Sequence, residues 1–188
     1  MKAIILNLFI AVGLFLSGCS DQSSLTGPSQ QNLQSSDPFV SLGDANLSLH
    51  KDDPLYVEQT INGNTGGTMS IVGSFHEDEI HVNGTITVPA GAYTGDQTIT
   101  VYMEGKHAVI DFGPSPFTFD IPLQFTMEIT GVKIKDKDED KIRFIYLDGY
   151  GNVTPVEMQG TTVANKKNKT LSVYGAQLPH FSRYGWAK

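Results

Sequence analysis

Residues 117–129 alternate between apolar and other side chains. A helix, with 3.6 residues per turn, would spread the apolar members around its circumference, whereas a strand places all of them on one face of a sheet. Such a face needs a second layer to cover it, and the rest of the chain offers more alternating runs and almost nothing helical. We therefore expect another sheet to pack against Phe117, Phe119, Ile121, Leu123, Phe125, Met127 and Ile129.

Pro122 interrupts this segment. Its nitrogen carries no hydrogen that could be donated to a neighbouring strand, so proline is not expected in the middle of a sheet. The sequence therefore predicts either one edge strand with a break or two strands that meet at a bend.

Further short alternating runs follow one another from about Asp53 to Lys188, separated by turns rich in Gly, Pro, Asn and Asp. We expect a hairpin tip at residues 165–168 and predict one all-β domain over residues 53–188, an antiparallel β-sandwich of eight or nine strands without a helix longer than one turn. The other candidate strands are residues 55–61, 67–72, 80–88, 99–103, 109–112, 142–146, 153–163 (one strand or two), 171–173 and 177–186.

The N-terminus has the layout of a secretory signal. Lys2 precedes an apolar run over residues 3–16. This run is too short to cross a bilayer, which takes roughly 20 residues. The run ends in Leu16-Ser17-Gly18-Cys19, which contains the single cysteine of the chain. We expect residues 1–18 to be a signal peptide that is removed.

This N-terminus resembles that of bacterial lipoproteins, whose lipobox has the pattern of residues 16–19. The resemblance implies cleavage before Cys19, a diacylglycerol on its thiol and usually a further acyl chain on its new amino group. Because two or more acyl chains anchor a protein stably, we expect the membrane to be a partner through Cys19. By analogy with Gram-negative lipoproteins, Ser20 is compatible with the outer membrane, so we expect a lipid-anchored protein of the cell envelope, at the outer membrane or cell surface. An ordinary signal peptide or an uncleaved anchor is the alternative.

Composition excludes two further properties. With one cysteine, the chain can form no internal disulfide. Removal of residues 1–18 takes away Lys2 and no acid, leaving 12 Lys and Arg against 20 Asp and Glu. Nucleic acid is therefore not expected as a partner, because no basic stripe is left for a phosphate backbone.

Residues 19–52 are expected to be the lipidated cysteine and a flexible linker, because Ser, Gln, Asn, Asp, Gly and Pro dominate them and they cannot bury enough apolar surface to order themselves. In the alternative interpretation, Phe39, Val40 and Leu42 form a first edge strand of the sandwich.

Five short motifs in the predicted sandwich resemble the ZU5 domain. They occur in the expected order and spacing between Gly66 and Tyr184: Gly66-Gly67-Thr68, Val88-Pro89-Ala90-Gly91-Ala92, Ile99-Thr100-Val101, Gly113-Pro114 with Phe119, Pro122 and Leu123, and His180-Phe181-Ser182-Arg183-Tyr184. ZU5 domains are β-sandwiches that serve as scaffolds in ankyrins, netrin receptors and death-domain proteins. The resemblance therefore implies an interaction module before it implies an enzyme.

The same resemblance gives one catalytic hypothesis. In some ZU5-related proteins a His-Phe-Ser sequence cleaves itself, which would make Ser182 the nucleophile, Phe181 the source of the attacked carbonyl and His180 the assisting group. Such a reaction needs a strained peptide bond and a base that activates the hydroxyl. In the alternative interpretation, Phe181 fills the core, Ser182 and Tyr184 satisfy backbone groups, and His180 lies at the mouth of the last strand.

No metal site or cofactor is expected. His76 and His81 are five residues apart, so they would share a face of neither a helix nor a strand, and we expect a solvated turn that leads into a strand. Residues 136–141 place acids at alternate positions, as an EF-hand loop begins, but the sixth-position glycine and the closing glutamate are absent and the lysines neutralise half the charge, so we expect a charged hairpin tip. Scattered aromatic and histidine side chains could contact a glycan or peptide, but each is expected to be core or rim packing: His50, Tyr93, His107, Tyr150 and Trp186.

The sequence therefore predicts a membrane-anchored bacterial lipoprotein that displays a non-catalytic interaction or structural module, with an unknown protein or glycan partner. Two alternatives remain: a self-processing domain cleaved between Phe181 and Ser182, and a carbohydrate-binding surface lipoprotein. Exposed aromatic residues lined up on one sheet face would favour the carbohydrate alternative.

Overall fold

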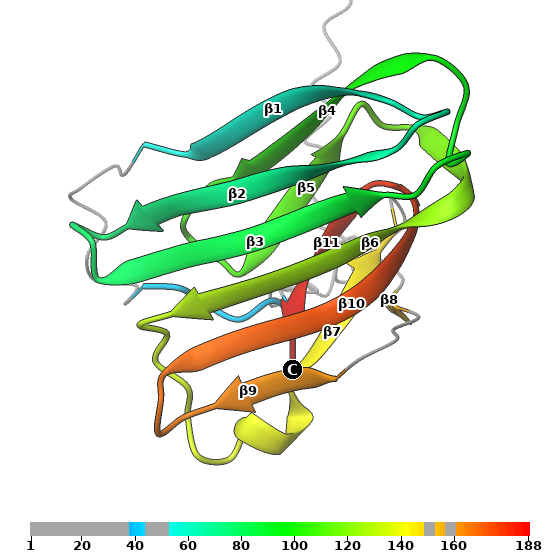
Figure 1. The fold of residues 1–188 in the computed structure, drawn as a ribbon. Helices are drawn as coiled ribbons and strands as arrows, with labels where there is room; N and C mark the ends of the chain where they lie inside the picture. Colours follow the sequence, from blue (N-terminus) through cyan, green and yellow to red (C-terminus); the bar gives the residue numbers. More distant parts are fainter. Residues whose placement is uncertain (1–37, 44–52, 149–152, 157–160) are drawn as a thin grey trace, which may run out of the picture. The chain divides into compact units, whose positions relative to one another are not determined.

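The computed structural model describes residues 38–43, 53–148, 153–156 and 161–188, which Figure 1 draws in colour. Within these residues the chain forms eleven strands and one 3-10 helix, Glu139–Lys141. The strands are β1 (Leu55–Asn62), β2 (Gly67–Phe75), β3 (Ile80–Val88), β4 (Asp96–Met103), β5 (Val109–Gly113), β6 (Phe117–Thr130), β7 (Arg143–Leu147), β8 (Val153–Pro155), β9 (Thr162–Asn165), β10 (Thr170–Phe181) and β11 (Arg183–Ala187).

The strands form two sheets that lie face to face (Figure 1). One has six strands in the order β1-β4-β5-β11-β7-β8, and the other has five in the order β2-β3-β6-β10-β9. Every pairing is antiparallel, which confirms the predicted antiparallel β-sandwich. The strand count is higher than expected partly because the predicted strand 177–186 bends at Ser182. There the chain leaves the five-stranded sheet as β10 and enters the six-stranded sheet as β11.

The apolar stripe of β6 lies in the core, as predicted. Leu123, Phe125, Met127 and Ile129 are fully buried, and the Phe125 ring packs between the sheets, 5.2 Å from the Phe112 ring of β5. The core collects the inward-facing residues of both sheets, so the alternation in the sequence becomes the division between interior and surface.

The expectation about Pro122 is wrong, because β6 is one continuous strand paired with β3 on one side and β10 on the other. The β3 ladder ends at Gln124, and the β10 ladder shifts register between Leu178 and His180. Pro122 therefore lies at an irregularity where no ladder hydrogen bond is required of its nitrogen, which is how a central strand tolerates proline. The same irregularity turns Ile121 outward, where 43% of it is exposed.

One of the predicted turns joins strands of different sheets, and another joins two paired strands of the same sheet. The turn at residues 63–66 carries the chain from β1 in one sheet to β2 in the other. The turn after Asn165 joins β9 and β10, which pair directly, and the Asn165 side chain accepts a hydrogen bond from the Asn168 backbone N–H (2.9 Å). The predicted hairpin tip at residues 165–168 is therefore confirmed.

Residues 38–43 lie within the body, although the sequence analysis assigned them to the linker 19–52. The Val40 N–H donates to the Trp186 carbonyl (2.7 Å), and the Val40 carbonyl accepts from the Ala108 N–H (2.7 Å). The segment is thus hydrogen-bonded on both sides, between the end of β11 and the chain that leads into β5. The folded part begins before Asp53.

The alternating directions of its side chains explain why the segment 38–43 folds although its neighbours in the sequence are polar. Val40 and Leu42 point into the main core, whereas Phe39 points to the opposite side and packs with Ile145 and Ala187. All three side chains of the segment are at most 6% exposed, so it buries enough apolar surface to order itself.

Candidate functional site

The outer face of the six-stranded sheet carries a lateral row of five side chains, one from each of five neighbouring strands. Tyr56 of β1 lies opposite Tyr102 of β4, which lies opposite Asp111 of β5. Asp111 lies opposite Arg183 of β11, and Arg183 opposite Leu147 of β7. We call Tyr56, Tyr102, Asp111, Arg183 and Leu147 the outer-face row. Neighbouring strands are about 4.8 Å apart, so these five residues span roughly 20 Å across the sheet.

The two tyrosines of the row are exposed to solvent, by 55% for Tyr56 and 39% for Tyr102. The two tyrosines lie directly opposite each other on one face of an antiparallel pair, so their Cβ atoms are neighbours. The Tyr56 hydroxyl donates to a carboxylate oxygen of Glu58 (2.6 Å), and this hydrogen bond raises the pKa of Tyr56.

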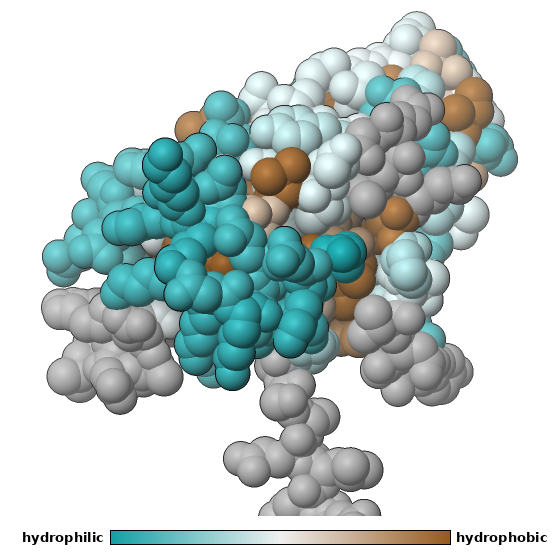
Figure 2. Space-filling view, turned by 90° about the horizontal axis from the view of Figure 1, so that it is seen from below, coloured by the Kyte–Doolittle hydropathy of each residue, from teal (hydrophilic) through white to brown (hydrophobic). Residues whose placement is uncertain are grey.

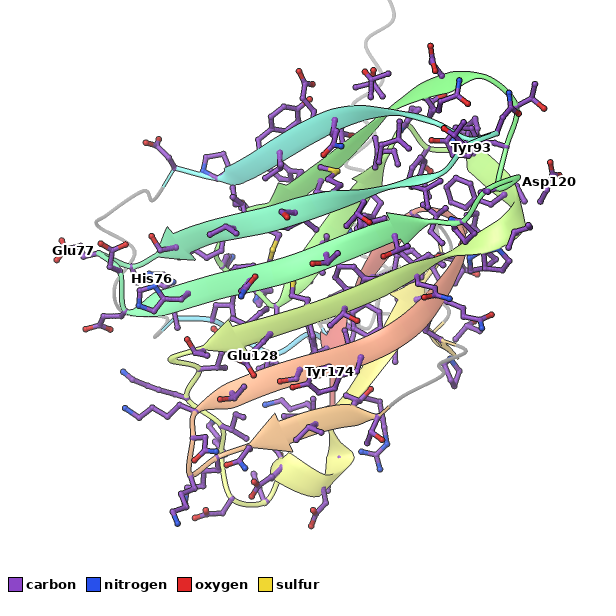
Figure 3. All side chains as sticks on the ribbon, viewed as in Figure 1. His76, Glu77, Tyr93, Asp120, Glu128 and Tyr174 are labelled. Carbon is purple, nitrogen blue, oxygen red and sulfur yellow. The ribbon has the colours of Figure 1, made fainter. Side chains whose placement is uncertain are left out.

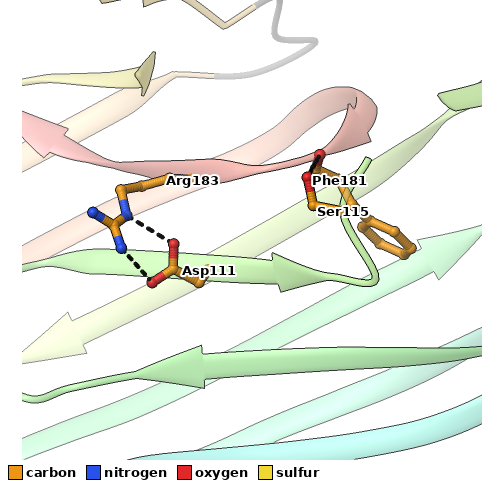
Figure 4. A network of polar contacts seen from close by, with 4 residues as sticks. All are labelled: Asp111, Ser115, Phe181 and Arg183. Carbon is orange, nitrogen blue, oxygen red and sulfur yellow. Dashed lines mark hydrogen bonds and ion pairs between the residues drawn. The ribbon is translucent and has the colours of Figure 1, made fainter. Parts of the chain in front are cut away.

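Asp111 and Arg183 form a bidentate ion pair in the middle of the row (Figure 4). Arg183 Nε lies 2.8 Å from Asp111 Oδ1, and Nη2 lies 3.1 Å from Oδ2. The parallel geometry fixes both planar groups, and both side chains are partly exposed.

Two hollows flank this ion pair, and both are lined by Asp111 and Arg183. The larger is a shallow depression of about 520 Å³ on the side of Ser182, also lined by Phe112, Ser115, Leu147 and Asp148. The smaller is about 110 Å³ and is also lined by Phe39, Tyr102, Glu104, His107 and Val109. The outer-face row therefore has concave surface on both sides of its charged centre.

The corner between β10 and β11 holds the peptide bond proposed for self-cleavage. Ser115 Oγ donates to the Phe181 carbonyl (3.1 Å), and the Phe112 N–H donates to the Ser182 carbonyl (2.9 Å). Figure 4 shows the Ser115 contact beside the ion pair. The Phe181 ring is buried, 4.8 Å from the Phe119 ring. Within the described residues, neither Phe181 nor Ser182 has a positive φ, and the bond between them is not cis.

The His180 side chain is not placed to act as the base for Ser182. Its ring packs edge-on against Tyr146 (4.8 Å between centroids), and its Nδ1 lies 3.4 Å from the Tyr184 hydroxyl. That hydroxyl donates to the His180 carbonyl (2.9 Å), while burial raises the pKa of Tyr184. In the part of the chain that the structure describes, nothing bonds Ser182 Oγ to His180. The corner thus brings the three candidate residues together without the contact that would activate the serine.

His76 and His81, the two histidines considered as a metal site, lie apart from the corner between β10 and β11. Figure 3 shows His76 and Glu77 at the turn between β2 and β3, at the opposite end of the strands from Tyr93 and Asp120. His76 Nε2 lies 3.1 Å from the Gly105 carbonyl, and His81 is an exposed residue of β3. Among the described residues, no group of three His, Cys, Asp or Glu side chains could hold a metal ion.

The expectation of a hairpin tip at residues 136–141 is wrong. This loop connects β6 of one sheet to β7 of the other and contains the 3-10 helix. Its acids pair with lysines: Asp136 with Lys166, and Asp138 with Lys188 (3.1 Å). The hydrogen bond from Lys188 holds the pKa of the Asp138 carboxyl below its usual range.

Two of the three scattered candidates that the structure describes are core residues. Trp186 is fully buried and Tyr93 is 5% exposed. The Tyr93 hydroxyl donates to the Ile61 carbonyl (2.9 Å), and burial, followed by the charge of Asp96, raises its pKa. His107 lines the smaller hollow, whereas His50 and Tyr150 lie outside the described residues.

The lipobox residues 16–19, including Cys19, also lie outside the described residues. Within the described part of the chain, no helix is long and apolar enough to cross a membrane.

Comparison with protein-family models gives no match to this chain. A comparison with curated proteins likewise finds none that is significantly similar.

Three residues of the row, Tyr56, Tyr102 and Asp111, were not predicted as site residues from the sequence. Arg183 was named only as part of the motif at residues 180–184. Each is a polar or amphipathic member of an alternating strand, and that alternation marks it as outward-facing. The row itself depends on which strands are neighbours, and β1, β4, β5, β11 and β7 are not consecutive in sequence.

Proposed function

We propose that this protein is a lipid-anchored lipoprotein of the bacterial cell envelope whose β-sandwich is a non-catalytic binding module. The observation that carries the proposal is the outer-face row, in which two exposed tyrosines adjoin a bidentate ion pair between two hollows. Aromatic rings and arginine are the side chains that most often dominate binding energy at protein surfaces. The lipobox at residues 16–19 supports the anchor.

Carbohydrate is the ligand class that this row favours. The flat apolar faces of sugar rings pack against tyrosine rings, while sugar hydroxyls exchange hydrogen bonds with planar carboxylate and guanidinium groups. Tyr56 and Tyr102 supply the first kind of contact, and Asp111 and Arg183 supply the second. The outer face of the five-stranded sheet offers a weaker match. Its exposed Val72 and Val163 lie at the two ends of a row that runs through Asn83, Glu128 and Ser172 and contains no aromatic residue. The exposed Tyr174 (Figure 3) lies at a register shift of β10, outside that row.

A position-specific crosslinking experiment tests the binding face in the intact cell envelope. A photoreactive amino acid at position 56 or 102 should capture a ligand, whereas the same amino acid at position 174 should not. Tyr174 is a suitable control because it is 43% exposed, close to the value for Tyr102, and lies on the other sheet. Equal capture from both faces would contradict the proposed binding surface.

The carbohydrate class is tested by measuring binding to a panel of soluble envelope polysaccharides and peptidoglycan fragments. Tyr56→Ala combined with Tyr102→Ala should abolish binding, and Tyr174→Ala should leave it unchanged. If crosslinking from position 56 captures protein and the panel shows no binding, the face binds a protein partner instead.

The anchor is tested separately by cell fractionation. The wild-type protein should be found in the membrane fraction with acyl chains on the N-terminal peptide by mass spectrometry, and Cys19→Ser should remove those chains. A wild-type protein recovered without acylation would contradict the anchor.

A further inference from the structure

Most of the positive charge of this acidic protein lies in one corner of the body. Of the 13 Lys and Arg residues, Lys2 lies in the expected signal peptide, and nine of the other twelve lie in residues 131–143, residues 165–169 and the C-terminal residue. These same segments contain four of the 20 acids, so the rest of the chain after residue 18 holds three basic residues against sixteen acids. We call the nine residues the basic corner: Lys133, Lys135, Lys137, Lys141, Arg143, Lys166, Lys167, Lys169 and Lys188.

Hydrogen bonds and strand pairing join these distant segments into one surface. The Val132 N–H donates to the Lys169 carbonyl (2.9 Å), and the Lys166 N–H donates to Glu139 Oε1 (2.9 Å). Arg143 lies opposite Ala187 in the sheet, which places the start of β7 beside the C-terminus. Figure 2 views the molecule from this side and shows hydrophilic residues gathered there.

The four acids inside the corner offset nearly half of its nine positive charges and leave a net charge of +5. Asp136 pairs with Lys166, and Asp138 pairs with Lys188. The exposed Lys135, Lys137 and Lys167 make no ion pair with any residue that the structure describes. Several ammonium groups therefore face solvent in this corner, whereas acids outnumber basic residues sixteen to three in the rest of the chain after residue 18.

The chain that leads to Cys19 enters the body at this corner. The Pro38 carbonyl accepts a hydrogen bond from the Lys188 N–H (3.2 Å), so Pro38 is a neighbour of the C-terminal member of the basic corner. Cys19 precedes Pro38 by 19 residues. Even a fully extended chain of that length reaches at most about 70 Å, so an anchor at Cys19 would keep the body close to the lipid surface.

We propose that the basic corner docks on the surface of an anionic phospholipid bilayer and acts as a second membrane contact beside the acyl chains. This inference rests on the proposed lipid anchor for the orientation of the body. Lysines near an anionic membrane surface each strengthen binding by about fivefold at physiological salt. The rest of the chain carries an excess of acids, which an anionic surface repels, so the charge distribution favours docking by the basic corner.

Docking by this corner leaves the outer-face row accessible. On β7, Arg143 belongs to the corner and Leu147 to the row, four residues further along the same strand. At about 3.3 Å per residue, the row lies roughly 13 Å from the corner along the strand. The proposed binding face would thus stand beside the membrane surface, with its ligand approaching along the bilayer.

The test uses the chain from residue 19 to residue 188 with Cys19→Ser, so that no acyl chain contributes. Binding is measured by co-sedimentation with vesicles of phosphatidylcholine alone and of phosphatidylcholine mixed with phosphatidylglycerol. The variant Lys135→Gln/Lys137→Gln/Lys167→Gln removes three positive charges from the corner. The matched control Ser70→Glu/Thr118→Glu/Gln124→Glu lowers the net charge by the same three units at exposed positions elsewhere.

We expect binding to the phosphatidylglycerol vesicles that weakens as salt is added, and little binding to phosphatidylcholine. The triple Gln variant should bind roughly a hundredfold more weakly, and the triple Glu control should change binding much less. Circular dichroism and thermal unfolding of both variants exclude misfolding as the cause. Absent binding, equal binding to both vesicle types, or an equal loss in the two variants would overturn the proposal.

These outcomes are independent of the anchor. If the wild-type protein is acylated at Cys19 and the unacylated chain ignores phosphatidylglycerol, the anchor stands and the docking corner fails. If the unacylated chain binds through its lysines and no acylation is found, the corner binds lipid without the proposed anchor.

Discussion

The ring of Phe39 lies directly on the backbone of Gly185. A Cβ atom added at Gly185 would stand 2.8 Å from two ring carbons of Phe39 and would also collide with the Ala108 carbonyl oxygen. Glycine at this position of β11 is therefore what allows a residue 146 positions earlier to lie flat against the outer face of the six-stranded sheet. The contact fastens the first described segment of the chain to its last strand.

Replacing Phe39 by Ala should lower the free energy of unfolding by about 3 kcal/mol, because it removes a nearly buried aromatic ring that packs with Ile145 and Ala187. Chemical denaturation measures the change. Tyr56→Ala is the control, since Tyr56 is 55% exposed and its loss should cost no more than about 0.5 kcal/mol. Equal effects of the two substitutions would show that residues 38–43 are not part of the folded body.

A comparison of chain lengths checks the same point. A chain that begins at Ser36 should unfold at a higher denaturant concentration than one that begins at Asp53, because the shorter chain loses Val40 and Leu42 from the core. It also leaves the carbonyl of Trp186 without the Val40 N–H. Equal denaturation midpoints for the two chains would show that the folded domain begins near Asp53, as composition predicts.

The sandwich was predictable because period-two alternation reports burial directly. The residues of β6 that face the core are the ones that the alternation selects, apart from Ile121. Strand order was not predictable in the same way, since it depends on long-range packing of similar strands. Local composition also gave the wrong prediction for residues 38–43, which it assigned to a flexible linker. Three apolar side chains in this segment pack with residues that lie more than 60 positions away in the sequence.

For the candidate site, too, the local motif was predictable from the sequence and the arrangement of distant strands was not. The His180-Phe181-Ser182 motif is visible in the sequence, but whether its groups touch is a matter of geometry at the corner between the sheets. The outer-face row is invisible in the sequence, because Tyr56 and Arg183 become members of one row only when β4 and β5 lie between their strands.

Self-cleavage between Phe181 and Ser182 should not occur. The Phe181 carbonyl accepts a hydrogen bond from Ser115, and His180 contacts Tyr146 and Tyr184 rather than the serine hydroxyl. Intact mass and a denaturing gel should therefore show one uncleaved species after signal removal, in both the wild type and Ser182→Ala. A wild-type species that lacks residues 182–188, together with an uncleaved variant, would reverse this conclusion.

Stability should depend on pH through Asp138. Lys188 depresses the pKa of this carboxyl in the folded state from its ordinary value of 3.8, so the ionised form contributes stability above that value. The contribution is lost as pH falls through the lower folded-state pKa. Asp138→Asn should thus be less stable than the wild type at pH 7, and the difference should shrink in acid, as measured by denaturation across the pH range.

Lys188→Gln serves as the reciprocal variant for this pair. Removing the ammonium group should move the pKa of Asp138 up toward its ordinary value in an NMR titration. A wild-type titration of Asp138 at or above the ordinary value would contradict the depressed pKa.

The ion pair between Asp111 and Arg183 should matter for binding more than for folding. Its side chains are 38% and 54% exposed, and exposed ion pairs contribute at most about 1 kcal/mol to stability. Arg183→Gln should therefore leave the denaturation midpoint nearly unchanged while it weakens ligand capture from position 56, because it removes the charged centre between the two hollows. A loss of stability above about 2 kcal/mol, or unchanged capture, would show that the pair is structural and that the ligand is held by other groups of the sheet.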